Sequence, residues 1–310
     1  MPQESLDFFW IATPFVALFG ACIGSFLSVC IYRIPRNESI VRPRSHCPHC
    51  GRMIPWYWNI PVLSWLLLRG KCRWCKAPIS FRYILLELFT SALFLLVWFQ
   101  AFSGLTLSWE MGQAWTAYDG GIITPKGGLL GLVPLLDMKL MYVYWLAIYG
   151  LILGSFIDIE HYILPDRVTI GGMIIGLIIS PLVPELHWTS SWSTALIRSA
   201  VGLGVGFGVL WLVSVLGSIA FKKEAMGFGD VKLMGAIGAF LGWKAVLFTL
   251  FASSLLGSLV GISLIVLHKR EFQGRIPYGP FLAAAAVIWM FWGPTLVSKY
   301  AAYFIFNPVP

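Results

Sequence analysis

The chain has 310 residues, of which 58% are hydrophobic and only 12% are charged, and its mean hydropathy is +0.79. A soluble domain carries about 25% charged residues, so this composition excludes an ordinary soluble protein and predicts a polytopic membrane protein. The formal net charge of +8 also suits a nucleic-acid-binding surface, but the basic residues cluster beside apolar segments. We therefore interpret the charge as a sign of membrane topology and expect no nucleic-acid partner.

Apolar segments close to the roughly 20 residues needed to cross about 30 Å of hydrocarbon occur eight times. They lie at residues 8–32, 83–102, 139–157, 168–184, 195–220, 231–243, 245–267 and 281–306. Backbone polar groups in lipid must be bonded within the segment, so we expect an all-α protein with about eight transmembrane helices. The sixth segment is the weakest, because it is short and contains Lys232. Glu4 and Asp7 stand where a signal peptide would be basic, so we expect the first segment to remain as an anchor.

The positions of the Lys and Arg residues predict the orientation, because cytoplasmic loops are enriched in them. With eight spans and an external N-terminus, the inner segments are 33–82, 158–167, 221–232 and 268–280. These segments hold 17 of the 22 Lys and Arg residues. We therefore expect a multi-pass plasma-membrane protein in contact with lipid, with its N-terminus outside. The Gly-rich, aromatic segment 103–138 then lies outside, and it carries no motif with a functional interpretation.

Residues 33–82 form the one sizeable polar domain, placed between the first and second spans. It contains two C-x-x-C motifs separated by 21 residues, whose cysteines are Cys47, Cys50, Cys72 and Cys75. Four thiolates with this spacing suit a closed tetrahedral zinc site of the zinc-ribbon type, and such a zinc is structural because protein fills all four positions. Gly51 and Lys76, directly after the motifs, fit tight thiolate-binding turns. Disulfides or redox chemistry are the alternative, which a reducing cytoplasm disfavours.

Two features of the first two spans bear on packing and function. Gly20 and Gly24 have the four-residue spacing that lets membrane helices approach closely, so helix packing is the favoured interpretation. Glu87 lies about one turn into the second span. A lone carboxylate at that depth is either paired with a basic neighbour such as Arg82 or functional, and both interpretations stay open.

Two aspartates stand at the boundaries of apolar segments on the same predicted face of the membrane. Asp158 follows the third segment, and Asp230 follows the glycines of Gly227-Phe228-Gly229, which permit close backbone approach. A carboxylate at such a position is energetically costly, so it is expected to be functional or paired with another group. A helix cap would explain Asp230 alone, but with Asp158 it predicts a two-aspartate protease site. The turn 275–281 contains glycine and proline and is expected to place its backbone near this site.

The chemistry of such a pair follows from its charge. Two close carboxylates cannot both ionise readily, so one holds a proton while the other is charged. The charged carboxylate takes a proton from a water that attacks the scissile carbonyl. The protonated one hydrogen-bonds the carbonyl oxygen and later protonates the leaving amine. The sequence does not decide which of Asp158 and Asp230 is the base.

With these motifs, the sequence resembles the type IV prepilin peptidase and N-methyltransferase family over nearly its whole length. The resemblance rests on residues 24–27, 32–36, 45–51, 59–61, 70–75, 82–87, 158–166, 227–233 and 276–281. It implies a first transmembrane anchor (1–32), a cytoplasmic four-cysteine zinc-binding domain associated with methyl transfer (33–82), a second helix with an outer loop (83–138) and a six-helix aspartic peptidase domain (139–310). The loop 103–138 is longer than the family pattern.

The resemblance implies that Asp158 and Asp230 are the catalytic residues of an inner-membrane enzyme. It would cleave the basic leader of type IV prepilins and pseudopilins after Gly and before Phe on the cytoplasmic side. It would then methylate the new N-terminus with S-adenosylmethionine. No Gly-rich nucleotide loop follows a strand, and we take the zinc-bearing domain and Glu87 as the candidate methyl-donor site. Glu160 and Asp166 are candidate contacts for the basic leader.

Two other classes of protein share part of this pattern. A presenilin-like intramembrane protease shares the G-x-G-D motif, but it has no place for the four-cysteine domain and cuts within the bilayer. A non-enzymatic zinc-ribbon scaffold of a secretion machine would tolerate asparagine in place of both aspartates.

Overall fold

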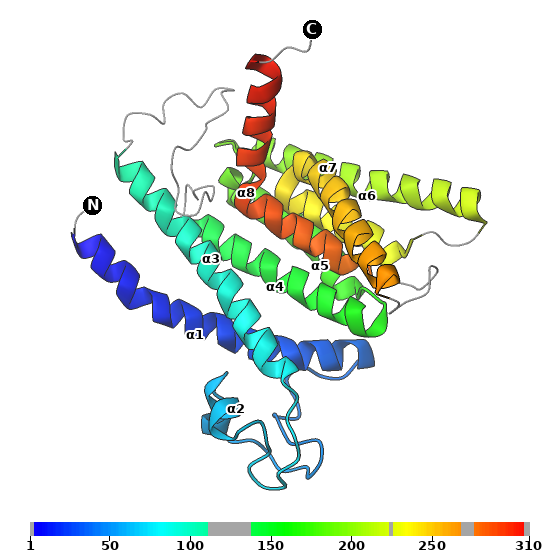
Figure 1. The fold of residues 1–310 in the computed structure, drawn as a ribbon. Helices are drawn as coiled ribbons and strands as arrows, with labels where there is room; N and C mark the ends of the chain where they lie inside the picture. The colour runs from blue at the N-terminus through cyan, green and yellow to red at the C-terminus, as the bar shows by residue number, and fades with distance from the viewer. Residues whose placement is uncertain (1–2, 111–137, 223–225, 268–275, 307–310) are drawn as a thin grey trace. The chain divides into compact units, whose positions relative to one another are not determined.

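The computed structural model describes residues 3–110, 138–222, 226–267 and 276–306 (Figure 1). Within these ranges the regular secondary structure is helical, apart from two isolated β-bridges, which confirms the all-α prediction. The chain divides into two compact units, Met1–Phe99 and Gln100–Pro310.

The N-terminal unit is built on α1 (Gln3–Arg33) and the first part of α3 (Arg82–Glu110). These helices approach closely where α1 has glycine. A Cβ atom on Gly20 would lie 2.8 Å from the Cα of Ser91, and one on Gly24 would lie 2.7 Å from the Cα of Glu87. The Ser91 hydroxyl also donates to the carbonyl of Ala17 at 2.8 Å. The helix-packing interpretation of the two glycines is therefore confirmed.

The polar segment between these helices has little regular structure. It contains η1 (Ile34–Arg36), η2 (Trp56–Trp58) and the short α2 (Leu63–Leu67). At its start the buried Arg33 guanidinium donates to the carbonyls of Ser39 (2.8 Å) and Pro43 (2.9 Å), which folds the chain back at the end of α1.

The C-terminal unit contains five long helices that pack together (Figure 1). They are α4 (Met138–His161), α5 (Asp166–Leu182), α6 (Trp192–Phe221), α7 (Phe228–Val266) and α8 (Gly279–Phe306), with η4 (Pro184–His187) between α5 and α6. Helix α7 is central, since it contacts α5, α6 and α8. The end of α4 and the beginnings of α7 and α8 meet around Leu164, which lies beside Gly154, Gly229 and Gly279.

Helix α7 is broken at Gly242, whose φ of 78° and ψ of 172° are not helical. The break separates two helical parts that correspond to the predicted sixth and seventh segments. It also leaves carbonyls near it to be satisfied by side chains. The Ser199 hydroxyl donates to the carbonyl of Ala239 at 2.7 Å, and the Ser180 hydroxyl, which pairs with His187 at 2.8 Å, lies 3.5 Å from the same carbonyl oxygen.

Five of the described helical segments are long and apolar enough to cross a membrane: Asp7–Arg36, Arg82–Ala101, Met138–His161, Trp192–Ala220 and Phe228–Val266. Gly279–Gly293 is apolar but shorter, and α5 has 17 residues. Each of the eight predicted segments falls on one of these helices or on α5 or α8, and two share α7; the count of eight stays a prediction. The prediction that the loop begins at residue 103 was wrong, because α3 continues to Glu110. Residues 111–137 of that loop lie outside the described part of the chain.

Candidate active site

Asp158 lies in the last turn of α4 with its side chain buried. Its Oδ2 accepts a hydrogen bond from the backbone N–H of Gly279, the first residue of α8, at 2.9 Å. A Cβ on Gly279 would lie 2.8 Å from the same oxygen. The expectation that the turn before α8 places its backbone near this aspartate is therefore confirmed, and glycine is required because any side chain would collide with the carboxylate.

Asp230 lies in the first turn of α7 and is also buried. Its backbone N–H donates to the carbonyl of Gly227 at 3.1 Å. Its Oδ1 is buried and has no hydrogen-bond partner among the described residues. The negative charge of Asp158 acts on Asp230 through space. The structure thus brings the two predicted aspartates together, with one carboxylate oxygen available for a further ligand.

Leu164 is a part of this site that the sequence analysis missed. It lies against three glycines from three helices. A Cβ on Gly229 would lie 2.8 Å from the Cβ of Leu164, and Cβ atoms on Gly279 and Gly154 would lie 3.4 Å and 3.3 Å from its methyl groups. Leu164 therefore packs between the ends of α4 and α7 that carry the aspartates and the beginning of α8 that bonds Asp158. Its sequence signal is only its position between Asp158 and Pro165, since a leucine carries no chemistry of its own.

An ion pair joins the beginnings of α5 and α7. The Lys232 Nζ lies 2.6 Å from Oδ1 of Asp166 and 5.1 Å from the ring centroid of Phe228. Asp166 is well exposed, so the pair contributes little to stability. The pair does hold the side chain of Lys232, which follows Asp230 by two residues in the sequence. It also means that Asp166, a candidate contact for a basic leader, already has a cation beside it.

Tyr278 ties the turn before α8 to the second half of α7. Its hydroxyl lies 2.7 Å from the Ser253 hydroxyl and 3.3 Å from the Ser254 hydroxyl. Its carbonyl accepts from the N–H groups of Phe281 and Leu282 in the first turn of α8. Tyr278 directly precedes Gly279, so these bonds hold the N–H group that donates to Asp158. We infer that Tyr278 positions Asp158 through the backbone of Gly279.

The four predicted cysteines meet in the N-terminal unit, and their sulfur atoms all lie within 4.8 Å of one another. None of the four is in a disulfide. The sulfurs of Cys47 and Cys75 are 3.7 Å apart. Metal–sulfur bonds of about 2.3 Å in a tetrahedral site place sulfur atoms roughly 3.8 Å apart. The arrangement therefore fits a metal ion held by four thiolates, and the disulfide alternative does not describe this structure.

The two C-x-x-C motifs begin 25 residues apart and fold in the same way. The N–H of each first cysteine bonds the carbonyl five residues later, and the N–H four residues after that cysteine bonds back to its carbonyl. Gly51 and Lys76 occupy equivalent positions and both have positive φ, 68° and 59°, which confirms the predicted tight turns. The N–H groups of Cys75 and Trp74 lower the pKa of the Cys72 thiol to about 6, which favours the thiolate that a metal binds.

Glu87 belongs to α3, and its side chain is buried against α1 and the polar segment. Its Oε2 accepts the N–H of Val62 at 2.7 Å, and its side chain also hydrogen-bonds Ser25. Val62 has φ 61° and ψ −54°, a backbone conformation that an L-residue adopts at a cost, so the bond holds a strained turn in place. Glu87 is therefore a structural link within its unit.

The long apolar helices define the class, a multi-pass membrane protein, and a buried pair of aspartates lies at the ends of two of them. The chain belongs to the type IV leader peptidase family. The model of that family matches residues 145–262, and the model of the bacterial peptidase A24 N-terminal domain matches residues 18–101. The second match contains the four cysteines and the first contains both aspartates. The protein is therefore an enzyme of the peptidase class, which disfavours the scaffold interpretation.

Curated relatives cover most of the chain. A prepilin leader peptidase/N-methyltransferase of Aeromonas hydrophila is 34% identical over 96% of both chains. Proteins of the same name from Legionella pneumophila and Myxococcus xanthus are 31% and 38% identical, over 97% and 83% of this chain and 98% and 64% of their own lengths. No solved structure gives a significant match.

Proposed function

We propose that this protein cleaves the leaders of type IV prepilins and pseudopilins with Asp158 and Asp230, and then methylates the new N-terminus. The observation that carries the peptidase half is the pair itself. Both aspartates are buried, the charge of Asp158 acts on Asp230, and one oxygen of Asp230 has no partner within the described structure. The names of the curated relatives supply the substrate class and the second activity.

We assign the role of base to Asp158, because the Gly279 N–H bonds its Oδ2 and a hydrogen bond to a carboxylate favours its charged form. Asp230, beside that charge and with Oδ1 unbonded, holds the proton. Asp158 then takes a proton from the attacking water as the water oxygen bonds the scissile carbon. Asp230 hydrogen-bonds the carbonyl oxygen and gives its proton to the leaving nitrogen as the C–N bond breaks. One proton remains on the pair, which titrates as a unit.

In this proposal the protein lies in the inner membrane and its active site faces the cytoplasm. Its support is the concentration of Lys and Arg in the segments beside both aspartates. The leader that precedes the cut is basic and stays on this side, while the apolar segment after the cut enters the membrane. Cleavage follows glycine and precedes phenylalanine.

The four-cysteine domain holds a structural zinc ion in this proposal. Zinc is the metal that four thiolates in two tight turns suit best, and it would fix two loops that otherwise have little regular structure. Methyl transfer from S-adenosylmethionine is assigned to this N-terminal region, with Glu87 as a candidate contact. The support is the N-methyltransferase activity in the names of the relatives and the match of residues 18–101 to a separate domain.

Purified protein incubated with a prepilin and labelled S-adenosylmethionine tests the proposal. We expect Asp158→Asn and Asp230→Asn each to lower leader release by about 10⁴-fold, measured by mass spectrometry. The matched control is Asp7→Asn, which changes an exposed carboxylate of α1 and should cleave like the parent. Cleavage that survives either substitution in the pair would overturn the two-aspartate mechanism. Cleavage by the parent without label on the new N-terminus would remove the methyltransferase half alone.

A further inference from the structure

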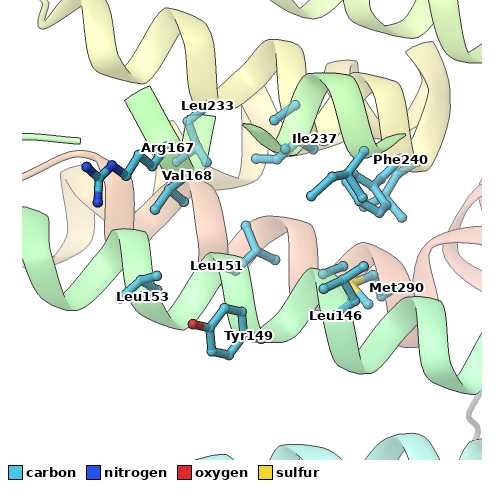
Figure 2. Close-up of a pocket in the computed structure, with 16 residues that line it drawn as sticks. Leu146, Tyr149, Leu151, Leu153, Arg167, Val168, Leu233, Ile237, Phe240 and Met290 are labelled. Carbon is cyan, nitrogen blue, oxygen red and sulfur yellow. The ribbon is translucent and has the colours of Figure 1, made fainter. Parts of the chain in front are cut away.

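A half-open apolar cavity of about 150 Å³ lies between α4, α5, α7 and α8 of the C-terminal unit (Figure 2). Apolar side chains from four helices line it, among them Leu151, Val168, Ile237 and Met290. Figure 2 shows Arg167 at one end, with its guanidinium directed away from the apolar side chains. An apolar cavity of this volume has room for a group of about the size of benzene.

Part of the cavity lining lies on the helix faces that carry the two aspartates. Leu151 and Ala147 precede Asp158 by 7 and 11 residues on α4, and Ile237 and Leu241 follow Asp230 by the same intervals on α7. Residues separated by 7 or 11 positions lie on one face of a helix, because a turn contains about 3.6 residues. On α8, Met290 follows Gly279 by 11 residues as well. Three helices thus continue from the aspartates into the cavity.

The distance along these helices from the aspartates to the cavity indicates which substrate residue can reach the cavity. Seven residues at about 1.5 Å each put Leu151 and Ile237 about 10 Å from the level of the aspartates. A peptide held extended at its scissile bond advances about 3.3 Å per residue. About three residues therefore separate the scissile bond from the cavity. The volume admits one large side chain, not a helix.

We propose that the cavity is a specificity subsite that takes one large apolar side chain about three residues after the scissile bond. The inference rests on the proposed peptidase function, in which the apolar part of the substrate follows the cut and enters the bundle. The occupant is a substrate side chain because the cavity continues the faces that carry the aspartates. The described side chains that meet it on those faces, Leu151, Ile237 and Met290, are apolar.

Gly150 offers a direct test, because it lines the cavity and a Cβ added to it would meet nothing within 4 Å. The Cβ of Gly150→Ala can therefore be added without displacing a neighbour, and the longer side chain of Gly150→Leu is expected to occupy more of the cavity. Gly171 on α5 is the matched control. A Cβ there also meets nothing within 4 Å, and Gly171 does not line the cavity.

Cleavage is measured as kcat/KM on prepilin substrates that carry leucine or alanine at each of the first seven positions after the cut. The parent and Gly171→Leu should prefer leucine at about the third position by about tenfold. Gly150→Leu should lose that preference and cleave the alanine substrate like the parent, with Gly150→Ala in between.

Three results would overturn the subsite. A parent that cleaves well but ignores side-chain size at all seven positions would refute it and leave the peptidase intact. Equal loss on every substrate with Gly150→Leu, relieved by changing the lipid of the nanodisc, would assign the cavity to an acyl chain. A parent that cleaves none of the substrates would remove the proposed function and the subsite together.

Discussion

Gly279→Ala tests whether the backbone of α8 sets the geometry of the catalytic pair. Gly279 has no positive φ, so alanine is compatible with its backbone, and the obstacle is the carboxylate of Asp158. The new Cβ would lie 2.8 Å from Oδ2, whereas ordinary contacts begin at 3.4 Å. The carboxylate or the helix must therefore move by at least about 0.6 Å, which lengthens or breaks the 2.9 Å bond from the Gly279 N–H.

The expected loss follows from that bond. A hydrogen bond to a charged group contributes about 1.5–3 kcal/mol, which corresponds to a loss of roughly ten- to 150-fold in kcat if the bond is made in the transition state. A displacement approaching 1 Å can cost about 10²-fold by itself. Alanine is a better helix former than glycine, so thermal unfolding should change little.

The assay is single-turnover release of the leader, followed by mass spectrometry, with thermal unfolding of each variant measured beside it. Gly257→Ala is the matched control, because its Cβ would lie 3.7 Å from the Phe281 ring, an ordinary contact. We expect the control to cleave at the parental rate. If Gly279→Ala also cleaves within about twofold of the parent, the bond to Asp158 has no catalytic role and our assignment of the base is wrong.

Three further outcomes follow from the structure. Cys72→Ser should lower the zinc content, measured by elemental mass spectrometry, from one ion per chain to less than one. It should also make the four-cysteine domain sensitive to protease. A variant that keeps its metal contradicts the four-thiolate site. Tyr278→Phe should lower kcat about tenfold at unchanged KM, while Tyr142→Phe, which alters an exposed tyrosine, should not; equal effects on both would remove the positioning role. Burial lowers the pKa of His187 to about 4 from about 6.5 in the unfolded chain, so below about pH 6.5 the unfolded state takes up the proton first and stability falls towards about pH 4. The thermal unfolding temperature of His187→Asn should depend less steeply on pH over this window than that of the parent. The same slope in both proteins would contradict the buried neutral imidazole.

The sequence alone determined the features that depend on local patterns. Long apolar segments predicted the helices, because lipid leaves the backbone no other partner. The spacing of the two C-x-x-C motifs predicted a shared site, since each motif closes its own turn through bonds within a few residues. The scarcity of acids in an apolar chain singled out Asp158 and Asp230, and the four-residue spacing of Gly20 and Gly24 predicted their helix contact.

Contacts between distant segments were decided only by the tertiary structure. The bond from Gly279 to Asp158 joins residues 121 positions apart, and no pattern in either segment specifies which N–H meets which oxygen. Leu164 entered the site through its shape, which fits beside glycines that have no side chain. The sequence offered two segments around residue 244, and only the structure shows that the chain folds back at Gly242, so that Val246 lies beside Gly238. The apolar cavity has no sequence signal at all, because empty space is set by how side chains from four helices fail to fill the volume between them.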